Sequence, residues 1–277
     1  MPIDKLPEDY TFPPVGRCIY CGATEGKMTR EHIIPLALNG NLKLPRASCG
    51  ACADKTREFE QLCTAEEHGM FFSIRARLGM KSRQGSTKRG TICTEVIGRD
   101  GTRSRKTFRI DDLPVAIYQW KLPPAGILIG RDPATEITTR KLISYWQSPK
   151  GLGQPFLETK GDTAVGTFAP EPFLQLLAKI GYSFAAGAIG PQNLMPELAD
   201  LILTKHPRHT DYTYLIGTDE FDLPYSPICP SSPPAHRLED VKRVASDGQT
   251  FSLVKVHIFQ NLGFPEYHVV VGRCGNQ

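Results

Sequence analysis

The chain has 277 residues with 40% hydrophobic side chains, a mean hydropathy of -0.27 and a net charge of +4. This length supports one large domain or two modest ones, each with its own core. No apolar run approaches the ~18 residues of a membrane span, and residues 1–10 lack the apolar segment of a secretory signal. We therefore expect a cytoplasmic protein with no membrane partner.

The N-terminal part divides into a lead-in and a compact module. Residues 1–16 are expected to be irregular, since they contain four prolines. Residues 17–72 carry cysteines, and their short apolar runs and the Asn39-Gly40 turn predict small strands and loops. From Ala51 to Phe72 the apolar spacing changes to that of a helix.

A basic segment follows over residues 73–109. From Arg75 to Arg109 the chain holds eleven basic and two acidic residues, so this stretch carries +9 while the remaining residues carry -5. Residues 84–87 indicate a loop. Asp100-Gly101 favours the tight turn of a hairpin, with Thr107–Ile110 as the returning strand.

Residues 110–277 are predicted to form a mixed α+β domain of unknown role. Its best helix runs from Glu171 to Ile189, where large apolar residues recur at helical spacing. Prolines make residues 226–235 a loop. Strands are expected at residues 125–130, 212–216, 251–259 and 267–271.

Four of the eight cysteines form two CxxC pairs, Cys18/Cys21 and Cys49/Cys52. Each pair can bring two sulfurs from one tight turn to a common ion, and four thiolates are the ligands that Zn²⁺ prefers in closed structural sites. Paired CxxC in such a chain predicts metal binding before disulfides. Four protein ligands leave no position for a substrate, so we expect a structural zinc that stabilises a module too small for its own core.

Between the two pairs lies Thr29-Arg30-Glu31-His32-Ile33-Ile34-Pro35. The order CxxC, EHIIP, a glycine-containing loop and ASCxxC before a helix resembles the HNH endonuclease family of bacteria and phages over residues 17 to about 61. The resemblance implies a small zinc-bound, treble-clef-like ββα-metal module, in which an acid-histidine pair lies on a short hairpin against a helix. The fold class is then α+β, with a mixed C-terminal domain after the module.

The same resemblance implies the chemistry of the pair. His32 would be the general base, because a neutral imidazole can take a proton from water at cellular pH. Glu31 would bind one catalytic Mg²⁺ or Mn²⁺ through a carboxylate oxygen. That ion would neutralise charge on the scissile phosphate, and the product would carry a 5′-phosphate.

The sequence departs from the family at two positions. The residue after the last cysteine, which is Asn or His in the family, is Ala53, and the family's middle Asn falls near Leu44. Asp54 and Glu60 are the carboxylates on the predicted helix that could complete the catalytic metal site instead. For each of them the alternative is an ordinary solvated helix face.

The basic segment suits a protein that holds a polyanion, because each neutralised phosphate adds salt-dependent affinity. Few aromatic residues interleave with the charges, which favours double-stranded DNA over single strands. The alternative is a solvated charged face. The residues expected to contact nucleic acid are Arg75, Arg77, Lys81, Arg83, Lys88, Arg89, Arg99, Arg103 and Arg105.

Three functions remain open from the sequence. The leading one is a metal-dependent endonuclease that hydrolyses DNA phosphodiester bonds. The second is a catalytically inactive, zinc-dependent nucleic-acid-binding protein, which Ala53 favours. The third is an interaction protein in which residues 110–277 dominate. The sequence identifies neither a recognition site nor a pathway nor an oligomeric state.

Overall fold

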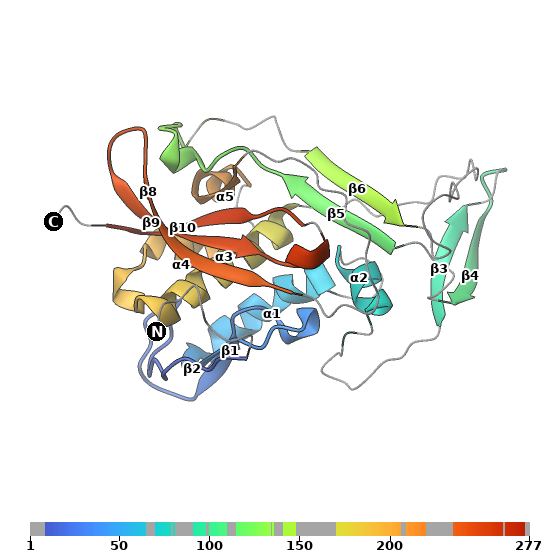
Figure 1. Cartoon of the computed structure of the whole chain (residues 1–277). Helices are drawn as coiled ribbons and strands as arrows, with labels where there is room; N and C mark the ends of the chain where they lie inside the picture. The colour runs from blue at the N-terminus through green and yellow to red at the C-terminus, as the bar shows by residue number, and fades with distance from the viewer. Residues whose placement is uncertain are drawn as a thin grey trace.

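A computed structural model describes residues 9–64, 70–78, 80, 91–97, 100–109, 115–133, 135, 141–147, 170–205, 209–219, 235–262 and 264–274. These residues form a mixed α+β structure, as expected from the sequence. One four-stranded sheet and a long central helix make up most of the body, and three two-stranded pairs lie around them (Figure 1).

The N-terminal part contains a ββα unit. Strand β1 (Met28–His32) pairs antiparallel with β2 (Lys43–Cys49), and helix α1 (Gly50–Thr64) begins at the next residue. The connection holds the short 3-10 helix η2 (Leu36–Leu38), which ends at Asn39 in a left-handed conformation with φ 66°. The expected short strands, turn and helix are confirmed here, and we call residues 17–64 the ββα module.

The helix expected from Ala51 to Phe72 is not continuous among the described residues. The buried residues of α1 recur at helical spacing from Cys52 to Cys63, which gives one face packed on the core. Residues 65–69 lie outside the described part of the chain, and the separate short helix α2 (Phe72–Arg77) follows. The single helix expected from Ala51 to Phe72 is therefore replaced, where the structure describes it, by α1 and the first residue of α2.

The central element is helix α3 (Pro170–Ala188), which confirms the helix expected at residues 171–189. It lies between the four-stranded sheet and α1, so it is buried on nearly all sides (Figure 1). Gly181 allows the helix to approach the sheet, because a Cβ at that position would lie 2.7 Å from the Cβ of Val269. Such an all-round buried helix normally contains only apolar residues.

The large sheet is antiparallel, with strand order β7-β10-β9-β8. The strands expected at residues 251–259 and 267–271 are confirmed by β9 and β10. The four strands are β7 (Ile216–Thr218), β8 (Arg237–Val244), β9 (Thr250–His257) and β10 (Tyr267–Arg273). Three further short helices border the sheet and α3: η5 (Pro191–Asn193), α4 (Pro196–Leu203) and η6 (Gln260–Leu262).

Two expected strands are wrong. Residues 125–130 contain the 3-10 helix η4 (Gly126–Leu128), and residues 212–215 belong to helix α5 (His209–Leu215), so that only Ile216 enters a strand. Both stretches are short, and most of their apolar residues are buried. A short apolar run shows neither a helical nor an alternating period, so its sequence cannot distinguish the two structures.

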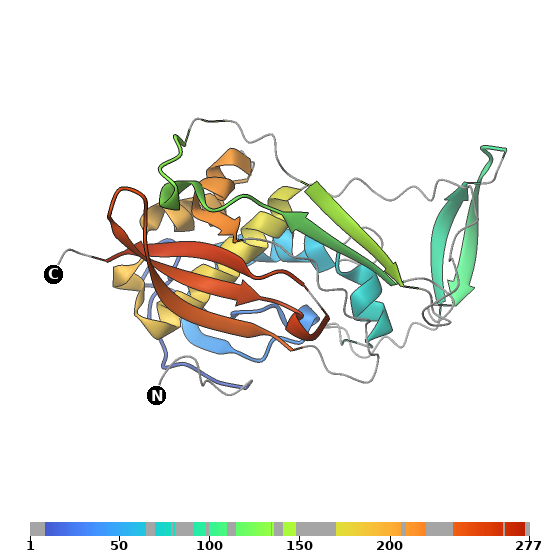
Figure 2. The same ribbon diagram turned by 45° about the horizontal axis from the view of Figure 1, so that its top comes forward.

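Two hairpins complete the fold. Strand β3 (Thr91–Ile97) pairs antiparallel with β4 (Arg103–Arg109), which confirms the hairpin expected around Asp100-Gly101. The Asp100 carboxylate accepts a 2.7 Å hydrogen bond from the Thr102 hydroxyl, and Gly101 has φ 81°. Strand β5 (Val115–Lys121) pairs with β6 (Lys141–Gln147). In both views the β3–β4 hairpin lies apart from α3 and the large sheet (Figures 1 and 2).

The ββα module and the C-terminal elements share one hydrophobic core. Buried residues such as Ile33 and Leu44 in the module belong to the same cluster as Leu253 and Val269 in the sheet. No helix in the described ranges is long and apolar enough to cross a membrane. The module is therefore stabilised by the C-terminal elements as well as by its own contacts.

His236 fastens the beginning of β8 to the module. Its Nε2 donates to the Leu38 carbonyl at 2.8 Å, and its Nδ1 accepts from the Phe259 amide at 3.2 Å. Only the neutral ring can donate at one nitrogen and accept at the other. Burial lowers the pKa of His236 from its usual 6.5 to about 4.

This geometry predicts a pH-dependent stability. The folded state keeps His236 neutral down to about pH 4, whereas the unfolded chain protonates it near pH 6.5. The contribution of His236 to the free energy of unfolding is therefore complete above pH 6.5 and is lost as the pH falls from 6.5 to 4. In His236→Gln the free energy of unfolding should be lower than in wild type at pH 7. Between pH 6.5 and 4 it should fall less steeply than in wild type, and the two slopes should differ by up to about 1.4 kcal/mol per pH unit. Urea unfolding at several pH values measures this; equal slopes in both proteins would contradict it.

Candidate metal centre and adjoining ion cluster

The four cysteines of the two CxxC pairs converge at one end of the ββα module. Cys18 and Cys21 lie in the segment before β1, Cys49 ends β2, and Cys52 lies in the first turn of α1. Their sulfur atoms all lie within 4.8 Å of one another, and the sulfurs of Cys21 and Cys49 are 3.8 Å apart. Tetrahedral ligation with metal–sulfur bonds near 2.3 Å places sulfurs about 3.8 Å apart. These four residues could therefore bind a metal ion.

Burial affects the charge of this cluster. It raises the pKa of the Cys18 and Cys52 thiols, because a thiolate loses hydration in the interior. An ion with two positive charges offsets that cost and releases the thiol protons when it binds. The four thiols therefore suit a bound cation better than four free thiolates.

A second cluster lies further along α1. The ammonium of Lys179, in the middle of α3, is 2.7 Å from Oε1 of Glu31 and 2.9 Å from Oε1 of Glu60. Lys179 is fully buried and the Glu31 side chain is 6% exposed, while Glu60 remains 24% exposed. We call these three residues the Lys179 cluster; it joins α3 to β1 and α1.

Two backbone oxygens also face the ammonium. Lys179 Nζ donates to the His32 carbonyl, and it lies 3.3 Å from the Ile33 carbonyl oxygen. Burial raises the pKa of Glu31, and the charge of Lys179 opposes that rise. Lys179 Nζ is therefore surrounded by two carboxylate oxygens and two carbonyl oxygens.

Tyr20 borders the same cluster. Its side chain is buried, and its hydroxyl lies close enough to Glu31 to lower the pKa of that carboxyl. Burial raises the pKa of this phenol, and the charges of Glu31 and Glu60 raise it further. A neutral phenol therefore lies beside the two carboxylates.

His32 lies on the opposite face of β1 from Glu31, as expected for neighbouring strand residues. Its ring is half-buried, and Nδ1 has no hydrogen-bond partner within the described ranges. Burial lowers the pKa of His32, and the positive charges of Lys179, Arg30 and Lys43 lower it further. The charge of Glu60 opposes these effects only in part, so the imidazole is neutral at pH 7.

The other predicted metal ligands do not gather with Glu31 in the way expected. Glu60 contacts the same ammonium as Glu31, that of Lys179. Exposed Asp54 pairs with Arg57 at 2.8 Å. Of the side chains that the structure describes, the four cysteines are the single group of three or more metal-ligating residues close enough to hold one ion. The residues around Glu31 therefore do not fit a catalytic Mg²⁺ or Mn²⁺, because an ammonium occupies the space between the carboxylates.

Sequence reasoning missed Lys179. One signal was available: a lone lysine interrupts the apolar run Leu176-Leu177-Ala178-Lys179-Ile180 of the best helix in the chain. A charged residue within an all-round apolar helix is almost never buried unless it is paired. The identity of its partners, however, depends on how α3 packs on the module.

The predicted nucleic-acid contacts have different surroundings. Arg75 is half-buried; its Nε donates to the Ala37 carbonyl at 2.7 Å, and its Nη1 donates to the Thr64 carbonyl. Arg103 and Arg105 are exposed on β4, as is Arg109 on the same strand face. The side chains of Arg77, Lys81, Arg83, Lys88, Arg89 and Arg99 lie outside the described part of the structure.

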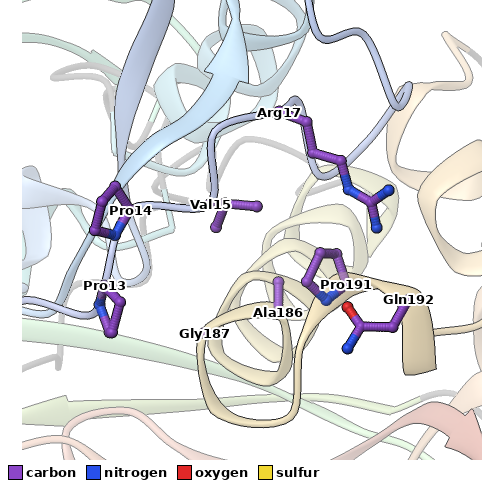
Figure 3. Close-up of a pocket in the computed structure, with 8 residues that line it drawn as sticks. All are labelled: Pro13, Pro14, Val15, Arg17, Ala186, Gly187, Pro191 and Gln192. Atoms are coloured by element: carbon purple, nitrogen blue, oxygen red, sulfur yellow. The ribbon is translucent and has the colours of Figure 1, made fainter.

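A shallow hollow of about 520 Å³ lies between the N-terminal segment and the end of α3 (Figure 3). Pro13, Pro14 and Val15 form one side, and Ala186 and Pro191 form the other. None of the predicted site residues lines it. The candidate site is therefore the pair of clusters around α1 and not this hollow.

Comparison with known proteins does not assign the chain to a family. No protein-family model matches the chain, and neither a curated protein nor a solved structure matches it.

The geometry of the four cysteines predicts that a variant lacking one of them loses both its bound metal and its folded structure. Cys49→Ser removes one of four ligands, and metal binding in comparable sites is worth on the order of 10 kcal/mol, close to the whole stability of a domain. We expect the purified variant to lose its metal by elemental analysis and to lose cooperative thermal unfolding. Cys274→Ser, outside the cluster, is the control and should keep one metal per chain. A Cys49→Ser protein that still holds one metal ion per chain would contradict the assignment of the four cysteines as the metal site.

Proposed function

We propose that this protein is an endonuclease of the HNH type, which hydrolyses DNA phosphodiester bonds with His32 as the general base. One observation carries the proposal: His32 lies at the end of β1 in a ββα unit at one end of which the four cysteine sulfurs converge. The order of these parts along the chain is the one that the HNH resemblance implies.

The metal at the four cysteines is proposed to be zinc. Tetrahedral sulfur ligation is typical of structural zinc sites, and the four thiols leave no open position for a substrate. The ion would connect the segment before β1 to the start of α1. Its contribution to function would be to hold β1, and with it His32, in place.

The surroundings of His32 suit a phosphodiester substrate. The ring is neutral at pH 7, so it can accept a proton from an attacking water. Exposed Arg30 and half-buried Lys43 bring positive charge to the same end of β1, and Lys43 pairs with Asp9 at 2.9 Å. Positive charge there favours a polyanion and stabilises developing negative charge. No step is assigned to a divalent ion, because Glu31 and Glu60 face Lys179.

The proposal predicts that DNA cleavage depends on one imidazole. Zinc-replete protein should nick supercoiled plasmid, and His32→Ala should lower the rate by about 10²–10⁴-fold, the usual contribution of a general base. Reactions with Mg²⁺, with Mn²⁺ and with EDTA should be run in parallel. His257→Gln, in the large sheet, is the control and should leave nicking unchanged. Equal rates in wild type and His32→Ala would exclude His32 as the base.

A second candidate function is nucleic-acid binding without cleavage. The Lys179 cluster favours it, because the carboxylate that the HNH resemblance assigns to a catalytic ion is engaged by an ammonium. Ala53 favours it too, since it offers no ligand atom. Binding to plasmid with no nicking under any metal condition would make this second function the better account.

Both functions predict that the β3–β4 hairpin contacts phosphates. Arg103, Arg105 and Arg109 are exposed on one face of β4, and alternate residues on a strand are about 6.8 Å apart. Replacing all three by alanine should weaken DNA binding and reduce the slope of log K against log salt by up to about 3. Fluorescence anisotropy at several salt concentrations measures both quantities.

The matched control replaces basic residues elsewhere on the surface. Arg237 and Lys242 lie on β8 in the large sheet, and neither is buried. Their alanine variants should bind DNA with the wild-type affinity and salt slope. An unchanged slope in the hairpin variant, or an equal loss in the control, would contradict a role for the hairpin.

A further inference from the structure

We infer that the ammonium of Lys179, which α3 supplies, fills an oxygen cage of the ββα module at the end of β1 and excludes a divalent ion from it. The cage consists of the carboxylates of Glu31 and Glu60 and the carbonyl oxygens of His32 and Ile33. This inference goes beyond the proposed function, since it concerns what occupies the cage and holds with or without cleavage.

The geometry of the cage supports this. Nζ lies 2.7 Å and 2.9 Å from the two carboxylate oxygens and 3.3 Å from the Ile33 oxygen, and it also donates to the His32 oxygen. A lysine ammonium has three donors and no acceptor. Four acceptors around three N–H groups satisfy the ammonium fully, and water has no access to it because Lys179 is 0% exposed.

The oxygen set is one that a divalent ion would otherwise use. Mg²⁺, Mn²⁺ and Ca²⁺ bind carboxylate and carbonyl oxygens, and Ca²⁺ does so at 2.3–2.6 Å in flexible geometry. Two carboxylates and two carbonyls converge here on a single point, the Lys179 nitrogen. The ammonium supplies the positive charge that such an ion would supply, so a divalent ion can enter only if Lys179 leaves.

The cation reaches the cage from a distant part of the chain. Lys179 belongs to α3, 147 residues from His32, and α3 itself is held between α1 and the large sheet. The aliphatic stem of Lys179 is therefore fixed by the core, and withdrawing the ammonium would move a charge into apolar surroundings. The ammonium thus remains in the cage whether or not a divalent ion is present in solution.

Metal binding without nucleic acid tests the inference. Zinc-replete wild type, Lys179→Met and Lys179→Arg are titrated with Mn²⁺, and free Mn²⁺ is followed by electron paramagnetic resonance. Methionine keeps most of the stem and removes the charge, whereas arginine keeps the charge. We expect Lys179→Met to bind one Mn²⁺ at least about tenfold more tightly than wild type, and Lys179→Arg to gain nothing.

Two further proteins locate the ion. Glu31→Gln added to Lys179→Met should abolish the gained binding, and Glu31→Gln alone should leave the Mn²⁺ binding of the wild type unchanged. The thermal midpoint of Lys179→Met should be low in EDTA and should rise on addition of Mn²⁺, while the wild-type midpoint should not move. A lysine with only a packing role would produce no such Mn²⁺-dependent recovery.

Either of two results would overturn the inference. One is stoichiometric Mn²⁺ binding by the wild type that Glu31→Gln removes, and this comparison remains decisive if Lys179→Met does not fold. The other is a folded Lys179→Met that gains no Mn²⁺ binding. The outcome is separate from the proposed function, because plasmid nicking by wild type and His32→Ala is measured independently.

Discussion

The buried ion pairs of Lys179 are the constraint on which the arrangement of the other elements depends. A fully buried ammonium needs nearby negative charge, and here Glu31 of β1 and Glu60 of α1 supply it at 2.7 Å and 2.9 Å. Removing one partner of such a pair leaves a buried charge unpaired and costs about 3–5 kcal/mol. The observed packing of α3 against β1 and α1 brings all three groups together, so the ion pairs join the C-terminal elements to the module.

The cysteine cluster and the Lys179 cluster lie at two different positions along α1 of the ββα module. Cys52, in the first turn of α1, lies beside the cysteines of the N-terminal segment, and Glu60, two turns further along, contacts Lys179 of α3. The β1–β2 pair cannot be stable alone, because isolated two-stranded pairs are marginal in water. Both clusters border β1, the strand that carries His32, so residues from three distant parts of the chain surround it.

The distribution of charged residues between core and surface also follows from this arrangement. His32, with Arg30 and Lys43 nearby, is accessible from one side of β1, while Glu31 on the other side is sealed by α3. The β3–β4 hairpin lies apart from the body (Figure 2). Its arginines at 103, 105 and 109 are exposed. The exposed arginines therefore remain at the surface, whereas Lys179, the buried lysine of the described residues, is neutralised by carboxylates.

The sequence alone determined the features that depend on neighbouring residues. The spacing of Cys18, Cys21, Cys49 and Cys52 predicted a metal cluster, Asp100-Gly101 predicted a hairpin, and apolar periodicity predicted α3, because a turn or a helix face is set within a few residues. It did not predict the helical state of residues 126–128 and 212–215, nor that Arg75 would donate to backbone carbonyls. Above all, tertiary structure decided that Glu31 and Glu60 meet Lys179, since contacts between groups so far apart in the chain arise only when α3 packs on the module.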